Sequence, residues 1–129
     1  MSAASIQSEV LTRFQPTGQH LLADLYGINP DKLTDLPALE SLLLESGKAA
    51  GATILSSHFH HFGAGLGVTG VVLLAESHIS IHTWPEFGYA ALDIFMCGKS
   101  DTKKALKIIQ TQLDISTCSI QTIVRNNSK

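Results

Sequence analysis

The segment Ser77–Trp84 limits the possible folds more than any other part of the chain, because polar and apolar side chains alternate along it. The polar members of the alternation are His78, Ser80 and His82, and the apolar members are Ile79 and Ile81. A period of two predicts a β-strand that buries one face and leaves the other open. We therefore expect a sheet with one packed face.

Five further segments are expected to be strands, because they are rich in β-branched, aromatic and other apolar residues: residues 19–26, 52–62, 68–76, 89–97 and 116–125. All of them except residues 68–76 are followed directly by Gly or Asn. One helix is expected to begin at a cap on Asp35 and to end near Gly51, and a second to cover residues 102–113. This order predicts an α+β fold, namely a two-layer α/β sandwich. Its sheet is expected to be largely antiparallel, with both helices packed on one face.

The length of 129 residues fits one domain, and the composition excludes several classes of partner. Nine basic and eleven acidic residues give a net charge of −2, so we expect neither a nucleic acid nor a membrane as partner. The longest apolar run, residues 68–75, is far shorter than the roughly twenty residues of a membrane span. Two cysteines do not suggest a disulfide framework, so a cytoplasmic protein with reduced thiols is expected.

The two ends of the chain are expected to lie outside the packed domain. Residues 1–16 are interpreted as a loose leader without the apolar centre of a signal peptide, and residues 126–129 as a frayed end. The low fraction of charged residues, 16%, also suggests that a second copy covers part of the surface.

The segment from Glu76 to Glu86 has the composition of a reactive site. Ser77 follows an apolar strand, His82 comes five residues later, and a carboxylate ends the segment. A serine hydroxyl is a weak nucleophile that needs a base or a strained carbonyl before it reacts. Ser77 lies between two strand-like segments with no ordinary turn residue, so a tight, strained connection is predicted there.

Four blocks appear in order between residues 60 and 98: Gly67-Val68-Thr69-Gly70, Ala75-Glu76-Ser77-His78, Ile81-His82-Thr83-Trp84-Pro85-Glu86 and Asp93-Ile94-Phe95-Met96-Cys97-Gly98. In these blocks the chain resembles the prokaryotic, pyruvoyl-dependent S-adenosylmethionine decarboxylases. The resemblance implies one decarboxylase-like domain over residues 1–129. It also implies that this domain cleaves itself into a chain of residues 1–76 and a chain of residues 77–129.

For self-cleavage, the resemblance implies that the Ser77 hydroxyl attacks the Glu76 carbonyl and that Ser77 becomes the covalent pyruvoyl cofactor. His82 matches the processing base, since an imidazole can take up a proton near neutrality. Thr69 matches a hydroxyl that holds the oxygen of the attacked carbonyl.

For turnover, the resemblance implies that the pyruvoyl group forms a Schiff base with S-adenosylmethionine and acts as the electron sink while CO₂ leaves. Cys97 matches the proton donor, Glu86 the carboxylate that binds the ribose, and Phe62 the aromatic ring against the adenine or the sulfonium. The product that the resemblance implies is the aminopropyl donor of spermidine synthesis. The family also implies a homodimer with the site near its interface. No metal ligands are expected, because no cysteine pair or acidic cluster joins the histidines.

Two alternatives remain open at this stage. The same pyruvoyl chemistry could act on arginine or ornithine, because the processing residues do not define the substrate pocket. Residues 63–67, next to Phe62, are glycine-rich and are expected to form a flexible connection. This loop is one residue longer than is typical of the family. A more distant alternative is a non-catalytic metal- or ligand-binding module, in which His58 and His60 of one strand meet His78 and His82 of another.

Overall fold

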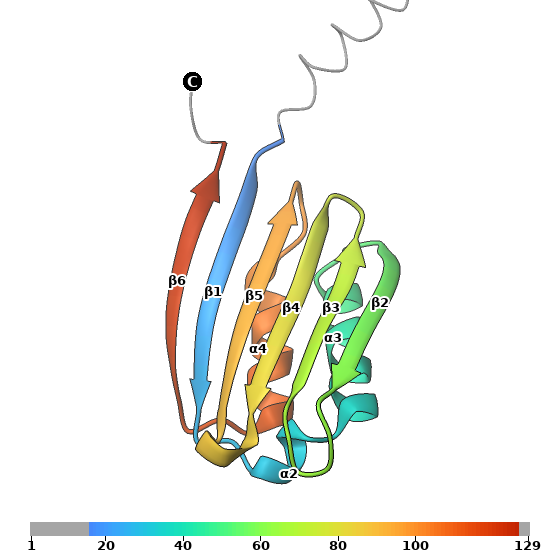
Figure 1. Cartoon of the computed structure of the whole chain (residues 1–129). Coiled ribbons are helices and arrows are strands. Elements are labelled where there is room, and N and C mark those ends of the chain that lie inside the picture. The colour runs from blue at the N-terminus through green and yellow to red at the C-terminus, as the bar shows by residue number, and fades with distance from the viewer. Residues whose placement is uncertain (1–15, 127–129) are drawn as a thin grey trace, which may run out of the picture.

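The computed structural model describes residues 16–126, and its centre is one six-stranded sheet (Figure 1). The strand order is β2-β3-β4-β5-β1-β6, and each neighbouring pair is antiparallel. The strands are β1 (Gly18–Tyr26), β2 (Ile54–His61), β3 (Val68–Leu74), β4 (Ser77–Trp84), β5 (Tyr89–Cys97) and β6 (Thr117–Arg125). The prediction of a largely antiparallel sheet is confirmed.

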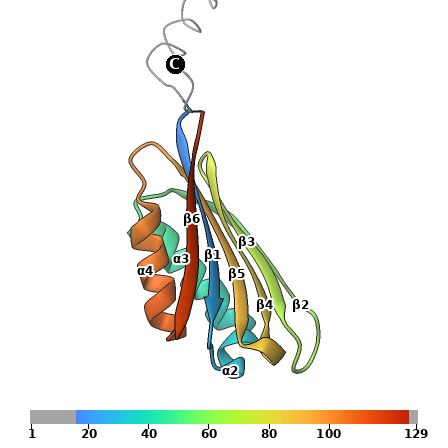
Figure 2. The ribbon, with the colours of Figure 1, turned by 90° about the vertical axis from the view of Figure 1, so that its left-hand side faces the viewer.

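The long helices α3 (Leu36–Ala49) and α4 (Thr102–Leu113) lie side by side on the same face of the sheet (Figure 2). The opposite face is not covered by any part of the chain between residues 16 and 126. This arrangement is the predicted two-layer α+β sandwich. No helix in the described range has the length and apolar character that crossing a membrane requires.

Two short elements were not expected. The one-turn helix α2 (Pro30–Leu33) follows β1, and the Asn29 side chain caps it by accepting a hydrogen bond from the backbone N–H of Asp31 at 3.0 Å. A 3₁₀ turn, η1 (Pro85–Phe87), connects β4 to β5. Pro85 ends β4, as predicted.

Both long helices begin at an aspartate cap. The Asp35 side chain accepts a hydrogen bond from the backbone N–H of Ala38 at 3.2 Å, which confirms the predicted start of α3. The Asp101 side chain caps α4 in the same way and accepts from the N–H of Lys103 at 3.0 Å.

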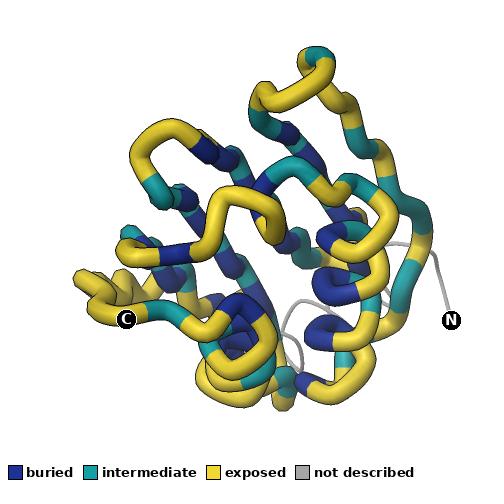
Figure 3. Tube along the Cα trace, turned by 90° about the horizontal axis from the view of Figure 1, so that it is seen from below, coloured by how far each residue is buried: buried dark blue, intermediate teal, exposed yellow. Residues whose placement is uncertain are grey.

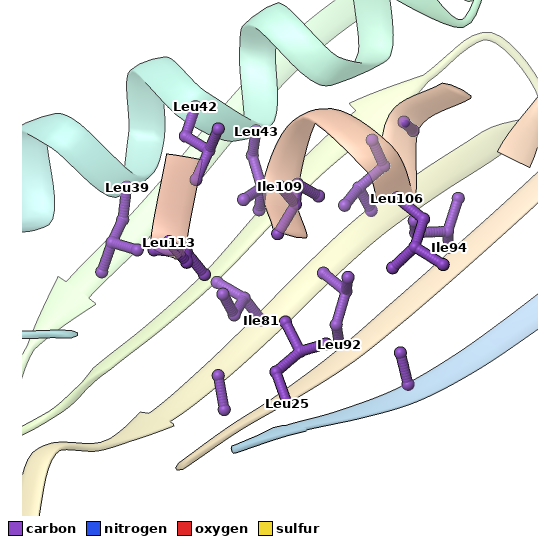
Figure 4. Packing of buried hydrophobic residues seen from close by; sticks show 14 of the residues in the cluster. Leu25, Leu39, Leu42, Leu43, Ile81, Leu92, Ile94, Leu106, Ile109 and Leu113 are labelled. Carbon is purple, nitrogen blue, oxygen red and sulfur yellow. The ribbon is translucent and has the colours of Figure 1, made fainter. Parts of the chain in front are cut away.

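The core lies between the helices and the packed face of the sheet. Ile79 and Ile81 are fully buried, as their alternation predicted, and buried positions alternate with partly exposed ones along the central strands (Figure 3). The leucines and isoleucines of α3 and α4 point into the same layer from above, among them Leu43 and Ile109 (Figure 4). Alternation in the strands and helical spacing in α3 and α4 therefore meet in one core.

Two predicted strand ends were wrong by two residues. The strand predicted over residues 68–76 stops at Leu74, because Ala75 and Glu76 form the turn to β4. The strand predicted from residue 52 begins at Ile54, and the backbone N–H of Ala75 donates to the Thr53 carbonyl at 2.9 Å beside it. Most of the predicted leader, residues 1–15, and the last three residues, 127–129, lie outside the described residues.

Thr83 connects three elements from within the core. Its hydroxyl donates to the Leu33 carbonyl at 2.7 Å and accepts from the Val68 N–H at 2.8 Å. Gly67 passes so close to Thr83 that an added Cβ would lie 2.0 Å from the Thr83 carbonyl oxygen. The sequence predicted a flexible connection over residues 63–67, but at Gly67 the glycine is needed for this close approach.

Replacing Thr83 by valine should destabilise the fold by about 2–4 kcal/mol. Valine keeps the branched shape, but the Leu33 carbonyl and the Val68 N–H are then buried without a partner. Urea unfolding of the uncleavable Ser77→Ala chain measures the effect. The matched control is Thr122→Val on exposed β6, for which we expect a change within about 0.5 kcal/mol. Equal effects of the two substitutions would show that the Thr83 hydroxyl does not stabilise the core.

Candidate active site

The turn between β3 and β4 is the strained connection that the sequence predicted. Leu74 and Ser77 face each other as the last pair of the hairpin, so only Ala75 and Glu76 form the loop. Glu76 has φ of 61°, in the left-handed region that a residue with a side chain enters at a cost of roughly 1–2 kcal/mol. The peptide bond that would be cut therefore directly follows a residue in an unfavourable conformation.

Ser77 and Cys97 are brought together, although twenty residues separate them in the sequence. Ser77 begins β4 and Cys97 ends β5, and these two strand ends lie at the same end of the sheet (Figure 1). The backbone N–H of Cys97 donates a hydrogen bond to the Ser77 Oγ at 3.3 Å. This contact occupies one lone pair of the hydroxyl oxygen and fixes its position.

The environment of the Cys97 thiol favours its neutral form. Burial raises the pKa of Cys97, and the negative charge of the Glu76 carboxylate raises it further. A thiol with a raised pKa keeps its proton at neutral pH. Cys97 is therefore suited to donate a proton rather than to attack as a thiolate.

Thr69 and His82 form a second pair of contacting side chains. They are cross-strand partners on β3 and β4, and Thr69 Oγ1 and His82 Nδ1 share a hydrogen bond of 3.0 Å. Both lie on the open face, because their neighbours Val68 and Ile81 are buried on the other side.

Glu86 and Phe62 lie toward the same end of the sheet as this second pair. Glu86 lies in η1, directly after β4, and Phe62 directly follows β2. Phe62 is 57% exposed, and its ring and the His60 ring form a T-shaped pair whose centroids are 4.7 Å apart. The seven predicted residues thus form two groups: Glu76, Ser77 and Cys97 at one end, and Thr69, His82, Glu86 and Phe62 toward the other.

Within one chain, His82 does not reach Ser77. The two residues are five positions apart on one extended strand, which is about 16 Å. By the alternation of β4, Ser77 shares its side with the buried Ile79, whereas His82 points to the open face. One chain therefore does not contain a contiguous site made of all the predicted residues.

A polar cluster next to Ser77 and Cys97 was missed in the sequence. On the open face, His20 Nε2 lies 3.6 Å from Asp93 Oδ1, and the His78 ring stacks on Phe95 at 5.9 Å. The pKa of His78 is lowered by burial and by His20, while Asp93 opposes the shift. A signal was present, since His20 and Asp93 both occupy polar positions in alternating strands, but it required the sheet order to be recognised.

The histidines do not support the metal-binding alternative. That hypothesis needed the strands that carry His58, His60, His78 and His82 to be adjacent, and β3 lies between them, so β2 and β4 are roughly 10 Å apart. In the register, Thr69 stands between His60 and His82. Between residues 16 and 126, no group of three or more potential ligand residues could hold a metal ion.

The fold and these contacts define a class of protein: a one-sheet α+β domain with a serine after a strained hairpin turn, whose hydroxyl oxygen accepts a hydrogen bond from the backbone of a cysteine. The sequence model of the S-adenosylmethionine decarboxylase family matches residues 19–126. The chain belongs to this family.

Named relatives and a solved structure agree with this assignment. The S-adenosylmethionine decarboxylase proenzyme of Thermodesulfovibrio yellowstonii is 44% identical over 107 residues, which cover 83% of this chain and 77% of the relative. The proenzyme of the same name from Persephonella marina is 55% identical over 93 residues, covering 71% and 69%. The crystal structure of the adenosylmethionine decarboxylase from Aquifex aeolicus matches with a TM-score of 0.75 and 41% identity, over 90% of this chain and 99% of that one. The comparisons do not support the arginine or ornithine alternative.

The left-handed backbone at Glu76 predicts how this position tolerates substitution. In the Ser77→Ala background, Glu76→Asn should leave the free energy of unfolding nearly unchanged, because asparagine enters the left-handed region readily. Glu76→Val should lower it by about 1–2 kcal/mol, because a β-branched side chain is disfavoured there. Thermal unfolding measures both variants, and equal stability of the two would show that the turn is not strained.

Proposed function

We propose that this chain is a self-processing, pyruvoyl-dependent decarboxylase that converts S-adenosylmethionine to its decarboxylated form and CO₂. The observation that carries the proposal is Ser77, which follows the left-handed Glu76 and accepts a hydrogen bond from the Cys97 backbone. Membership of the family and the proenzyme names of its relatives support the same function.

Self-cleavage begins with the Ser77 hydroxyl, which attacks the Glu76 carbonyl carbon. The new C–O bond replaces the C–N bond between the two residues, so an ester forms and the amine of residue 77 is released. Removal of the Cα proton of residue 77 then expels residues 1–76 with a free carboxylate. The remaining dehydroalanine tautomerises, water adds, and ammonia leaves, which turns residue 77 into the pyruvoyl group. His82 is the base for the Cα proton, and Thr69 fixes its ring through the bond to Nδ1.

In turnover, the pyruvoyl group supplies the keto function that accepts the substrate amine and withdraws electrons as CO₂ leaves. This chain's own residues bind the substrate and return a proton. The exposed Phe62 ring offers a face for the adenine or the sulfonium, Glu86 offers a carboxylate to the ribose hydroxyls, and the neutral Cys97 thiol protonates the substrate Cα. A reaction that needs a reduced thiol suits a cytoplasmic enzyme.

The separation of the two groups of residues supports a site shared by two copies of the chain. Processing needs His82 close to Ser77, but the strand holds them about 16 Å apart. A second copy that packs on the open face in the opposite direction brings its own Thr69, His82 and Glu86 to the end of the sheet that carries Ser77 and Cys97. The two-fold symmetry of such a homodimer makes two equal sites.

The open face has the side chains that such packing requires. Four large apolar residues on this face are 40–49% exposed in the single chain: Tyr26, Leu73, Trp84 and Ile123. Two sheets that pack face to face lie about 10 Å apart, with the side chains of both inner faces between them. The half-buried His20, His78 and Asp93 would then be enclosed at the interface.

The substrate is tested by measuring CO₂ release from carboxyl-labelled S-adenosylmethionine, arginine and ornithine. We expect release from S-adenosylmethionine alone, and none from the Ser77→Ala chain, which cannot form the pyruvoyl group. Comparable release from arginine or ornithine would contradict the proposed substrate. Release by the Ser77→Ala chain would contradict the proposed cofactor.

The shared site is tested by complementation of two inactive variants. Alone, Ser77→Ala cannot be cleaved, and His82→Ala should be cleaved about 10²–10⁴-fold more slowly than the wild type. In a mixed dimer, Ser77 of the His82→Ala chain meets His82 of the other chain. Co-expression of the two, with tags of different size, should therefore yield cleaved His82→Ala chain, as measured by mass. A His82→Ala chain that stays whole in the mixture, while the wild type is cleaved, would contradict a shared site.

A further inference from the structure

A row of three stacked aromatic rings crosses the open face beside η1. The rings belong to Tyr26 on β1, Tyr89 on β5 and Trp84 on β4. Their centroids are 5.4 Å apart between Tyr26 and Tyr89 and 5.2 Å apart between Tyr89 and Trp84, with interplanar angles of 23° in both pairs. Aromatic rings stacked in this way attract each other beyond what the burial of their surface contributes.

The middle ring of this row is anchored to a charged side chain. The Tyr89 hydroxyl donates to Asp24 Oδ1 at 2.5 Å, a short bond to a carboxylate. This bond, together with burial, raises the pKa of Tyr89 to about 12. Tyr89 is therefore fixed at both its ring and its hydroxyl.

Trp84 and Tyr89 also close the loop that carries Glu86. Trp84 ends β4, Tyr89 begins β5, and the two residues pair with each other. The four residues between them, including η1, are therefore held at both ends by one stacked pair. Inside this loop the N–H of Gly88 donates to the Pro85 carbonyl at 3.1 Å. On its other side Trp84 contacts the ring of His82 at a centroid distance of 6.3 Å.

We propose that Tyr89, anchored by Asp24, is a positioning residue. Through Trp84 it holds in place Glu86, whose carboxylate binds the substrate ribose, and the base His82. The inference rests on the proposed function, and it adds residues that neither touch the substrate nor take part in the chemistry. The contacts form one chain from Asp24 through Tyr89 to Trp84.

The position of the row distinguishes this role from packing of the core. The core lies on the opposite face, where the neighbouring Ala90 is fully buried, whereas Trp84 is 40% exposed and Tyr26 is 42% exposed. Tyr89 itself is partly exposed and lies outside the main hydrophobic cluster. Loss of the Tyr89 hydroxyl should therefore affect the site more than the stability of the fold.

The experiment compares Tyr89→Phe, Tyr89→Leu and Tyr26→Phe as full-length chains. Tyr89→Phe keeps the stack but removes the bond to Asp24, and we expect KM for S-adenosylmethionine to rise about tenfold with kcat within about twofold. Tyr89→Leu also removes the stack, so it should raise KM further and slow self-cleavage. Tyr26→Phe is the matched control, because it removes a hydroxyl from the end of the same row and leaves the Asp24–Tyr89 bond intact.

Trp84 is the only tryptophan of the chain, so its fluorescence reports the row directly. Its emission should shift in Tyr89→Leu and stay unchanged in Tyr26→Phe. A wild-type KM and cleavage rate in both Tyr89 variants, with the wild-type chain active, would overturn the positioning role even if their melting temperatures fall. A wild-type chain that neither cleaves nor decarboxylates would instead overturn the proposed function, and this inference with it.

Discussion

The alternation of side chains across a single antiparallel sheet is the constraint on which the rest of this structure depends. Because α3 and α4 cover one face, one half of the strand residues makes the core, with Ile79, Ile81 and Ile94 fully buried. The other half is left free for polar groups that a core could not accept without partners. The histidines, aspartates and aromatic rings of the open face are thus a consequence of the same pattern that builds the core.

The same geometry separates the reacting groups. An extended strand keeps Ser77 and His82 about 16 Å apart however the side chains turn, and a turn with Glu76 at φ 61° adds local strain where the chain would be cut. In the proposed homodimer, a second copy in the opposite direction would remove the separation without any change of fold. In the proposed mechanism, the turn and the Cys97 contact prepare Ser77 for cleavage, and the assembly of two chains would complete the site.

Much of this could be predicted from the sequence because the relevant signals are local. Alternation located the strands, Asp35 located the start of α3, and the lack of a turn residue before Ser77 indicated the strained connection. The order of the strands could not be predicted in this way, since pairing joins residues far apart in the chain. For that reason the metal hypothesis placed β2 beside β4, and the contacts of Asp24 with Tyr89 and of His20 with Asp93 were missed. Gly67 was interpreted as flexible because its neighbour Thr83 is remote in sequence.

The most direct test of the central claim, cleavage at Ser77, is an intact-mass spectrum of the purified protein, prepared without reductive treatment. We predict two chains, of 76 and 129 − 76 = 53 residues. The shorter one should be lighter by one ammonia than the same chain with an N-terminal serine, as a pyruvoyl group requires. A single mass of the uncleaved chain, unchanged after long incubation, would contradict self-cleavage at this serine.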